Sequence, residues 1–363
     1  MQSISGHSTG KTTSAAKTMT AKELIARHKK SYGEGAVSEG GHQQIVARVP
    51  TGLFPFDLAS GGGFPRGRAS IVYGPESSNK TNICLKAVAN HQQLWPEQIN
   101  IFVAIEGFDP LWARQLGVDT EKLIVLYPSY AEQAVDMIEE YLHADDCGIV
   151  VLDSLAAMVT TQEAEKSAEG AIVGGASVAV GKLVRKTTLA FTEAEKAGRS
   201  PTLLYINQTR FKIGVMFGNP ETMPGGNAPR FQSALTVRVY GKNLTDTKIS
   251  QVMPVIKETT FTIPKWKVPI VAASGLFKMV TYPHGGFLVG EVDDWNTVSQ
   301  YLRAAGELEK TGAKGWTMRG EAYPTLQACR DRLQGDRAFG LEVRRSIIER
   351  VLADGMAALQ ESV

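Results

Sequence analysis

Residues 71 to 81 of the chain read Ile-Val-Tyr-Gly-Pro-Glu-Ser-Ser-Asn-Lys-Thr. This stretch follows the pattern of a phosphate-binding loop, except that Asn79 stands where the pattern has its second glycine. An apolar run precedes the loop and a helical pattern follows it, which is the setting in which backbone N–H groups bind phosphate at a helix N-terminus. The pattern therefore predicts a nucleotide site, and a surface loop rich in glycine and serine is the alternative.

The last residues of this loop have specific expected roles. Lys80 would reach the β- and γ-phosphates, and the Thr81 hydroxyl would bind Mg²⁺. Asn79 is expected to adopt a positive φ, because asparagine is among the least costly residues with a Cβ in the left-handed region. The residues expected to line the phosphates are Gly74, Pro75, Glu76, Ser77, Ser78, Asn79, Lys80 and Thr81.

The composition of the chain restricts the kinds of protein that it can be. The net charge of the 363 residues is +2, so nucleic-acid binding would depend on a local basic patch. Cys84, Cys147 and Cys329 lie far apart in apolar or helical contexts. This indicates cysteines that stay reduced and serve in packing, and not disulfides or a metal site. No apolar run approaches the ~20 residues that span a bilayer, and the N-terminus lacks the apolar core of a signal peptide. We therefore expect a protein of a reducing cytoplasm.

The chain divides into four stretches. Residues 1–19 are rich in Ser, Thr, Gly and Lys and are expected to be disordered. Residues 20–48 are expected to hold a helix, opened by a Thr-x-x-Glu capping box, and a linker; the apolar stripe of this helix is too small to fold alone and needs another surface to dock on. Residues 49–290 alternate apolar runs with helical patterns, which predicts a mostly parallel sheet covered on both faces. Residues 291–363 are expected to form a small C-terminal domain. The expected strands are 69–73, 99–105, 122–126, 148–152, 202–207 and 234–239.

Three of these strands end in polar side chains that a phosphate-loop ATPase would need. The carboxylate of Asp153 would hold the water shell of Mg²⁺, although a strand also ends in Asp for reasons of turn geometry. Glu106 would orient and activate water beside the γ-phosphate, and a solvated glutamate at a strand end is an equal alternative. Gln208 would sense the γ-phosphate, and an amide that satisfies a turn is the alternative.

Residues 209–231 read TRFKIGVMFGNPETMPGGNAPRF. A glycine-rich loop of this length inside a compact domain is usually functional. Its apolar side chains and flanking cations suit single-stranded nucleic acid, because bases stack on apolar groups while cations hold the backbone. The alternative is a loop folded onto the core. The DNA-binding residues expected here are Arg210, Lys212, Ile213, Met216, Phe217, Gly225, Gly226, Asn227 and Arg230.

These strings resemble the RecA family of homologous-recombination proteins, and the resemblance runs from about Thr20 to the C-terminal domain. It rests on the phosphate loop, on the segments 106–119 and 151–157, and above all on 206–228, which is nearly the bacterial form of the second DNA-binding loop. The resemblance implies an α/β fold with a RecA-like phosphate-loop ATPase core, in which a mostly parallel twisted sheet is flanked by helices. The resemblance also implies an N-terminal oligomerisation helix, which docks on the adjacent subunit, and a small C-terminal α/β domain.

The resemblance also assigns roles in ATP binding. It implies that Asp109, Trp112 and Tyr282 contact the adenine. It implies that Lys265 and Lys267 reach the ATP phosphates bound to a neighbouring protomer. An aromatic residue at the protomer interface matches Phe231.

A first DNA-binding loop is implied at residues 162–178, with Val173 as an apolar wedge. Arg185 and Lys186, on the helix that follows, would hold DNA phosphates. This part of the chain matches the family poorly. Together with Asn79, a short interval between Glu106 and Asp109 and the lack of an acidic C-terminal tail, it suggests a phage-type or otherwise distant relative.

The sequence predicts an ATP-dependent DNA strand-exchange recombinase that uses ATP and Mg²⁺ and forms helical homo-oligomeric filaments on single-stranded DNA. Homologous double-stranded DNA would be its second substrate, and single-strand-binding and mediator proteins are expected partners. We expect it in the bacterial cytoplasm, including that of a phage-infected cell. One alternative is a RecA-fold accessory ATPase without strand exchange, and another is a replicative-type helicase, which the second-loop string disfavours. The expected catalytic residues are Glu106, Lys80, Gln208, Lys265 and Lys267.

Overall fold

The computed structural model describes residues 19–37, 46–165, 175–211, 221–246, 248–250, 253–313 and 315–361. The chain divides into two compact units, Met1–Ile45 and Val46–Val363. The described part of the first unit holds helix α1 (Ala21–Tyr32) and a short 3₁₀ helix, η1 (Glu34–Ala36). Thr20 and Glu23 form the expected capping box at the start of α1, so this prediction is confirmed.

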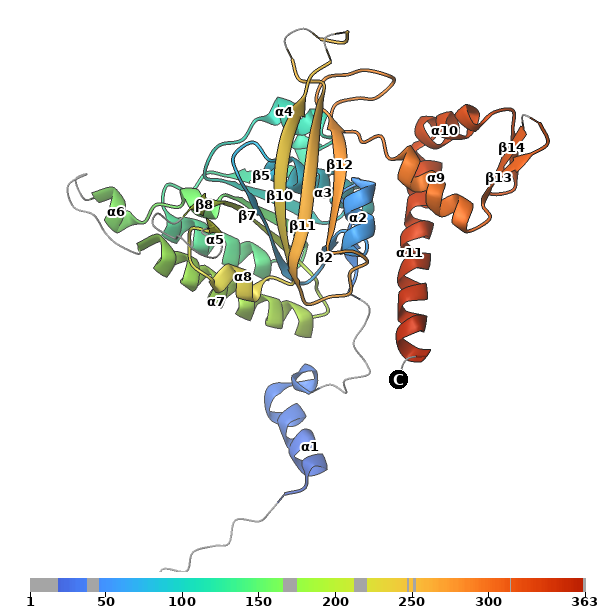
Figure 1. Cartoon of the computed structure of the whole chain (residues 1–363). Helices are drawn as coiled ribbons and strands as arrows, with labels where there is room; N and C mark the ends of the chain where they lie inside the picture. Colours follow the sequence, from blue (N-terminus) through green and yellow to red (C-terminus); the bar gives the residue numbers. More distant parts are fainter. Residues whose placement is uncertain are drawn as a thin grey trace, which may run out of the picture. The chain divides into compact units, whose positions relative to one another are not determined.

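The second unit is built on an eight-stranded sheet with the order β12-β11-β10-β3-β7-β6-β4-β5 (Figure 1). The strands from β10 to β5 in this order pair in parallel, whereas β10, β11 and β12 pair antiparallel. All six strands expected from the sequence are present. The strands are β3 (Ala69–Gly74), β4 (Ile99–Ala104), β5 (Leu123–Leu126), β6 (Cys147–Asp153), β7 (Thr202–Gln208), β10 (Leu235–Leu244), β11 (Ile256–Trp266) and β12 (Ser274–Val280).

Further elements accompany the sheet. The helices are α2 (Phe54–Ser60), α3 (Lys80–Leu94), α4 (Pro110–Gln115), α5 (Ala131–His143), α6 (Thr161–Glu165), α7 (Gly175–Lys196) and α8 (Ala228–Gln232), with the 3₁₀ helices η3 (Thr120–Lys122) and η4 (Leu155–Ala157). Two short antiparallel pairs join β1 (Arg48–Val49) to β2 (Phe64–Pro65) and β8 (Arg210–Phe211) to β9 (Glu221–Thr222).

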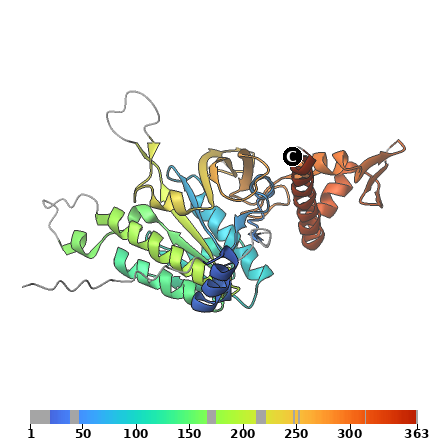
Figure 2. The ribbon, with the colours of Figure 1, turned by 90° about the horizontal axis from the view of Figure 1, so that it is seen from below.

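The sheet is buried on both faces because its strands are apolar on both. In β4, Phe102 packs into the cluster that contains α3, whereas its neighbours Ile101 and Val103 pack into the cluster formed with α5 and α7. Successive side chains of a strand point to opposite faces, so a continuous apolar run serves both clusters. Figure 2 shows α5 and α7 side by side on one face, where they contact each other.

Residues 295–361 form an α/β arrangement with its own apolar cluster. It holds α9 (Trp295–Ala304), α10 (Leu326–Gly335), α11 (Arg337–Glu361) and an antiparallel sheet of β13 (Leu308–Thr311), β14 (Gly315–Met318) and β15 (Glu321–Tyr323). Its cluster joins Val298, Leu302 and Ile347 to Phe54 and Leu58 of α2. The C-terminal α/β character is confirmed, and the exact domain boundaries expected from the sequence stay predictions.

Four parallel strands bring the candidate site residues to one edge of the sheet. Gly74 at the end of β3 is in register with Gln208 at the end of β7, and Ala104 at the end of β4 is in register with Asp153 at the end of β6. Ligands of open α/β sheets bind beyond the carboxyl ends of such strands. Within the described residues, no helix is both long and apolar enough to cross a membrane.

Candidate functional site

The loop between β3 and α3 has the backbone shape of an anion site. Ser77 and Asn79 adopt positive φ angles of 56° and 73°, which confirms the prediction for Asn79. Alternation of left- and right-handed residues turns successive N–H groups toward one concavity. Asn79 caps α3, and the first N–H groups of a helix have no intrahelical acceptor. The loop therefore presents donors that suit a phosphate chain.

Close packing against β10 decides the shape of this loop. A Cβ on Gly74 would lie 2.1 Å from the carbonyl oxygen of Val239 and 2.9 Å from Ser78 Oγ, so only glycine fits. Ser78 Oγ donates to the carbonyl of Pro75 at 2.7 Å and closes the loop on itself.

Lys80 follows Asn79 and turns back over the same loop. Its Nζ donates to the carbonyl oxygen of Pro75 at 2.6 Å. Burial lowers the pKa of Lys80, and the carboxylates of Asp153 and Glu106 act in the opposite direction. A phosphate would offer this ammonium a charged acceptor in place of a neutral carbonyl, which makes a stronger hydrogen bond.

Thr81 and Asp153 meet where a Mg²⁺ ion would bind. Thr81 Oγ1 donates to Asp153 Oδ2 at 2.7 Å. Asp153 is buried, and this burial raises the pKa of its carboxyl to about 6, with Glu106 adding to the rise and Thr81 and Lys80 opposing it. The described residues contain no group of three or more His, Cys, Asp and Glu side chains that could hold a metal alone. Mg²⁺ in nucleotide sites takes most of its ligands from phosphates and water, so Thr81 and Asp153 fit it.

Glu106 joins the ends of three strands. Its backbone N–H donates to the carbonyl of Asp153 at 3.1 Å, which holds it beside β6. Its Oε1 accepts hydrogen bonds from Gln208 Nε2 at 3.0 Å and, closer, from Ser154 Oγ. The residue is exposed, so its carboxylate is accessible to water. The role of Glu106 as a water-activating base stays a prediction.

The residues expected at the adenine have separate structural partners. Asp109 Oδ1 caps α4 by accepting from the N–H groups of Leu111 at 2.9 Å and Trp112 at 3.1 Å. This cap was missed, although Asp followed by Pro is a typical helix start. The Trp112 indole Nε1 donates to Asn82 Oδ1 at 2.8 Å. Tyr282 is 40% exposed, and no ring contact joins it to Trp112 in the described part of the chain. Their adenine contacts stay predictions.

The two lysines at the end of β11 bind the last turn of α8. Lys265 Nζ donates to the carbonyls of Ser233 at 2.6 Å, of Phe231 at 3.1 Å and of Arg230, and Lys267 Nζ donates to that of Phe231 at 2.8 Å. Cations are favoured at the negative end of a helix. Burial lowers the pKa of Lys265 to about 8, and the positive charges of Lys267 and Arg230 add to the effect. The Phe231 ring is 68% exposed, and its role at an interface stays a prediction.

Part of the predicted DNA surface can be located. Arg210 precedes residues 212–220 in the chain, and Gly226, Asn227 and Arg230 follow them; all four residues are exposed. Gly225, with a φ of 83°, is buried against Val180 of α7. Lys212, Ile213, Met216, Phe217 and Val173 lie outside the described residues.

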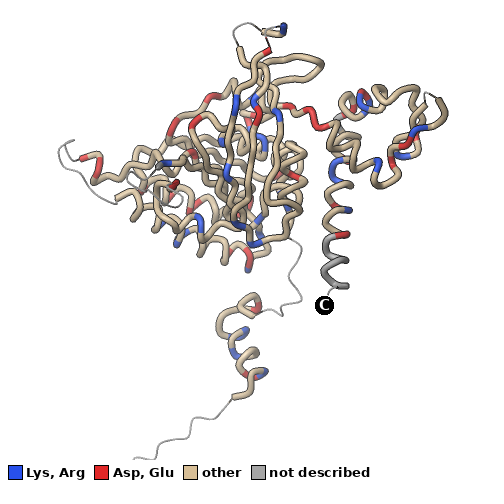
Figure 3. Tube along the Cα trace, viewed as in Figure 1, with Lys and Arg blue, Asp and Glu red and all other residues tan. Residues whose placement is uncertain are grey.

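The helix α7 carries the other two predicted phosphate contacts. Arg185 is exposed, whereas Lys186 Nζ binds Asp136 Oδ1 at 2.8 Å and the Glu139 carboxylate of α5. The charge of Lys186 is therefore largely neutralised within the fold, and its DNA contact stays a prediction. Lys and Arg are interspersed with Asp and Glu along the described chain (Figure 3).

Sequence reasoning missed an ion pair at the base of the segment that is predicted to bind DNA. Arg238 Nε donates to Glu221 Oε1 at 2.9 Å, and the side chain of Glu221 is only 6% exposed. Thr209 Oγ1 donates to the same Glu221 oxygen at 3.2 Å. The two ends of the loop are thus tied to β10, and no local sequence signal pairs a loop glutamate with a distant strand arginine.

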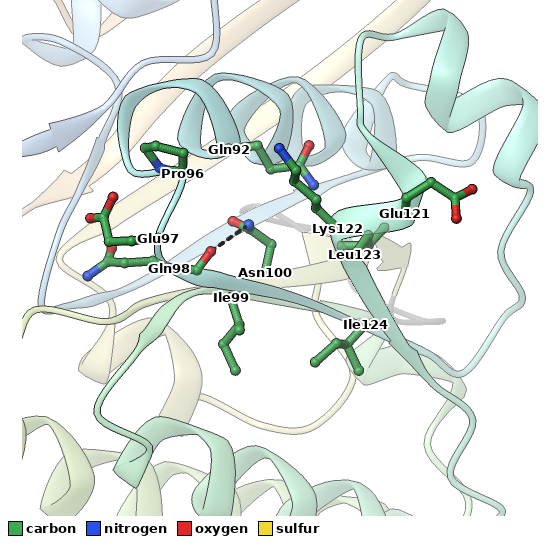
Figure 4. Close-up of a pocket in the computed structure, with 10 residues that line it drawn as sticks. All are labelled: Gln92, Pro96, Glu97, Gln98, Ile99, Asn100, Glu121, Lys122, Leu123 and Ile124. Atoms are coloured by element: carbon green, nitrogen blue, oxygen red, sulfur yellow. Dashed lines mark hydrogen bonds between the residues drawn. The ribbon is translucent and has the colours of Figure 1, made fainter.

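A cavity of about 290 Å³ lies elsewhere, at the amino ends of β4 and β5 (Figure 4). Gln98, Asn100, Lys122 and Leu123 are among the residues that line it. None of the predicted site residues does so, because those residues lie at the opposite, carboxyl edge of the sheet. The cavity is therefore separate from the candidate nucleotide site.

A family model described as the RecA N-terminal domain matches residues 17–277. The chain belongs to this family. It is similar to Protein RecA of Mycobacterium ulcerans, 40% identical over 219 residues, and of Symbiobacterium thermophilum, 38% identical over 220 residues. Protein RecA of Nocardia farcinica is 40% identical over 219 residues. Each alignment covers 59% of this chain and 61% of the relative. The similarity therefore spans less than two thirds of the length of each of these relatives.

Proposed function

We propose that the protein is an ATP-dependent DNA strand-exchange recombinase that forms helical filaments on single-stranded DNA. The observation that carries the proposal is the 3.0 Å hydrogen bond from Gln208 to Glu106. Gln208 ends β7, directly before the candidate DNA loop, and Glu106 lies beside the phosphate loop. One contact thus links the segment that would bind DNA to the group that would activate water. Membership in the RecA family supports the same activity.

In this proposal ATP binds with Mg²⁺ at the phosphate loop. The ion would neutralise charge on the phosphates during transfer. Lys80 would leave the Pro75 carbonyl for the phosphates, while Thr81 and Asp153 would hold the ion and its waters. Glu106 would accept a proton from the attacking water, and Gln208 would hold the Glu106 carboxylate in place.

The proposed partners are single-stranded DNA, homologous duplex DNA and further copies of this chain. Lys265 and Lys267 would act on the ATP of a neighbouring protomer, and their contacts with α8 would connect that action to the DNA loop that precedes it. Mediator and single-strand-binding proteins are further proposed partners. We propose that the protein acts in the bacterial cytoplasm, including that of a phage-infected cell.

Strand exchange between homologous oligonucleotides tests the proposal. The reaction is run with ATP, with a non-hydrolysable analogue and without nucleotide, and a heterologous duplex serves as the control. Exchange that needs both a nucleotide and homology is the expected result. DNA-stimulated ATP hydrolysis without exchange would instead indicate the accessory ATPase.

A further inference from the structure

An unbroken set of side-chain hydrogen bonds connects β11, the phosphate loop and α4. Asn79 Nδ2 donates to Thr259 Oγ1 at 2.7 Å, and Asn82 Nδ2 donates to Asn79 Oδ1 at 2.8 Å. Trp112 Nε1 donates to Asn82 Oδ1 at 2.8 Å. We call these four side chains the amide relay. Its inner end is dry, since Thr259 is fully buried and Asn79 is 5% exposed.

The relay has only one possible direction. An indole N–H is a donor and never an acceptor, so Asn82 must turn its carbonyl oxygen toward Trp112. The amide nitrogen of Asn82 then faces Asn79 and requires its oxygen. The remaining amide nitrogen of Asn79 meets the hydroxyl of Thr259. Neither amide can flip without placing two donors or two acceptors against each other, so Trp112 determines the orientation of both.

The backbone of the loop does not by itself explain these amides. A glycine at position 79 would adopt the observed φ of 73° at no steric cost. What the Asn79 side chain adds is a hydrogen bond at each end of its amide. The result is that the indole of Trp112, half-buried against the apolar cluster of α3, is also held at Nε1. A ring held at two points keeps one plane.

We propose that Asn79 and Asn82 are positioning residues that fix the plane of the Trp112 indole for stacking on a nucleobase. Base binding would then depend on an amide within the phosphate loop. The inference rests on the proposed function, because it requires that a nucleoside triphosphate binds at this loop. Holding an aromatic face in its bound orientation reduces the ordering cost of binding, and this gain applies only to ligands that carry a base.

The test compares MgATP with inorganic tripolyphosphate, which has the phosphates without the base. Affinities are measured by calorimetry or by competition, for the wild-type chain and for Asn82→Leu, which keeps a similar volume without the amide. Asn82→Leu should weaken ATP binding by about tenfold, equivalent to about 1.4 kcal/mol, and leave tripolyphosphate binding within about twofold. Trp112→Phe, which keeps a ring but lacks the N–H, should show the same pattern.

Non-additivity provides a second, independent readout. The double variant Asn82→Leu/Trp112→Phe should bind ATP about as well as either single variant, because each change breaks the same contact. Trp316→Phe in β14 is the matched control and should leave both affinities unchanged. Should Asn82→Leu fail to fold by circular dichroism, Asn79→Gly, which keeps the backbone of the loop and removes its amide, decides the comparison.

Equal losses of ATP and tripolyphosphate affinity would overturn the inference, since Asn82 would then only shape the phosphate loop. Additive losses in the double variant would do the same.

The proposed function fails in a different way. If the wild-type chain binds ATP with the expected relay behaviour but exchanges no strands, the recombinase proposal falls and the relay stands. If it binds no ATP, both fall.

Discussion

Gln208 Nε2 and Glu106 Oε1 lie 3.0 Å apart, although their strands β7 and β4 are separated in the sheet by β6. The two side chains meet because they lie beyond the carboxyl ends of their strands, where Ser154 also binds Glu106. The contact orients the carboxylate from one side and leaves the residue exposed to water. Gln208 therefore connects the end of β7 to the proposed base.

Glu106→Gln should retain ATP binding and DNA-bound filaments while ATP turnover falls by about 10²-fold or more, because an amide cannot accept the proton of water. Steady-state ATPase and nucleotide affinity are measured in parallel, and filaments are observed by electron microscopy. Glu97→Gln, at the rim of the separate cavity, is a matched control that should keep normal turnover. Near-normal hydrolysis by the Glu106 variant would remove Glu106 from the catalytic role.

Lys265→Ala/Lys267→Ala should leave nucleotide binding by the isolated chain largely intact and suppress DNA-stimulated ATPase, since the lysines are proposed to act on a neighbour. Mixing this variant with Lys80→Ala protein should restore part of the activity, because each supplies what the other lacks. The measurement is ATPase across mixing ratios, with co-filaments verified. Because both lysines bind carbonyls of α8, melting temperature is recorded as a control for a purely structural loss. Absence of any rescue in verified co-filaments argues against action in trans.

Position 79 should tolerate glycine and reject valine. Asn79→Gly keeps the left-handed backbone and should retain ATP hydrolysis, with weakened ATP affinity because the amide relay is lost. Asn79→Val places a β-branched residue at a φ of 73° and should lose nucleotide binding. Equilibrium ATP binding and ATPase rates distinguish the two variants. Retention of tight ATP binding by the valine variant would show that the loop does not need this backbone shape.

DNA-stimulated ATPase activity should fall as pH rises through about 8. Burial lowers the pKa of Lys265 to about 8, so the lysine loses its charge in this range. Below this pH the ammonium is charged and can act on a phosphate, and above it the neutral amine cannot. The profile of kcat/KM against pH, from 7 to 9.5, measures the falling limb. Lys265→Arg should move this limb to higher pH, since a guanidinium stays protonated throughout the range.

Stability should change with pH in the opposite direction to ATPase activity. A folded-state pKa below the usual value of Lys means that the unfolded chain holds this proton more tightly. The charged lysine therefore lowers the free energy of unfolding below pH 8. This unfavourable contribution becomes smaller as pH rises from about 8 toward the ordinary lysine pKa. Melting temperature over the same pH range checks the contribution of Lys265, with Lys265→Arg as the comparison.

Much of the candidate nucleotide site could be predicted from the sequence. The loop between β3 and α3, the strands that end at Asp153, at Gln208 and just before Glu106, and the positive φ of Asn79 follow from short patterns. Each depends on residues within about ten positions along the chain, where backbone preferences act directly. The six apolar strands were predicted for the same reason. The strands β11 and β12 were not, because polar residues interrupt their apolar runs; β11 pairs antiparallel with β10 and with β12.

Only the tertiary structure decided which distant side chains meet. Asn82 and Trp112 are 30 residues apart and meet through the placement of α4 beside α3. Lys186 binds acids of α5 that lie 47 to 50 positions earlier, and Lys265 binds α8 carbonyls over 30 positions away. The physical reason is the order of the strands in the sheet. A local pattern determines that a strand forms and where it ends, but the neighbours of that end depend on how the whole sheet is assembled.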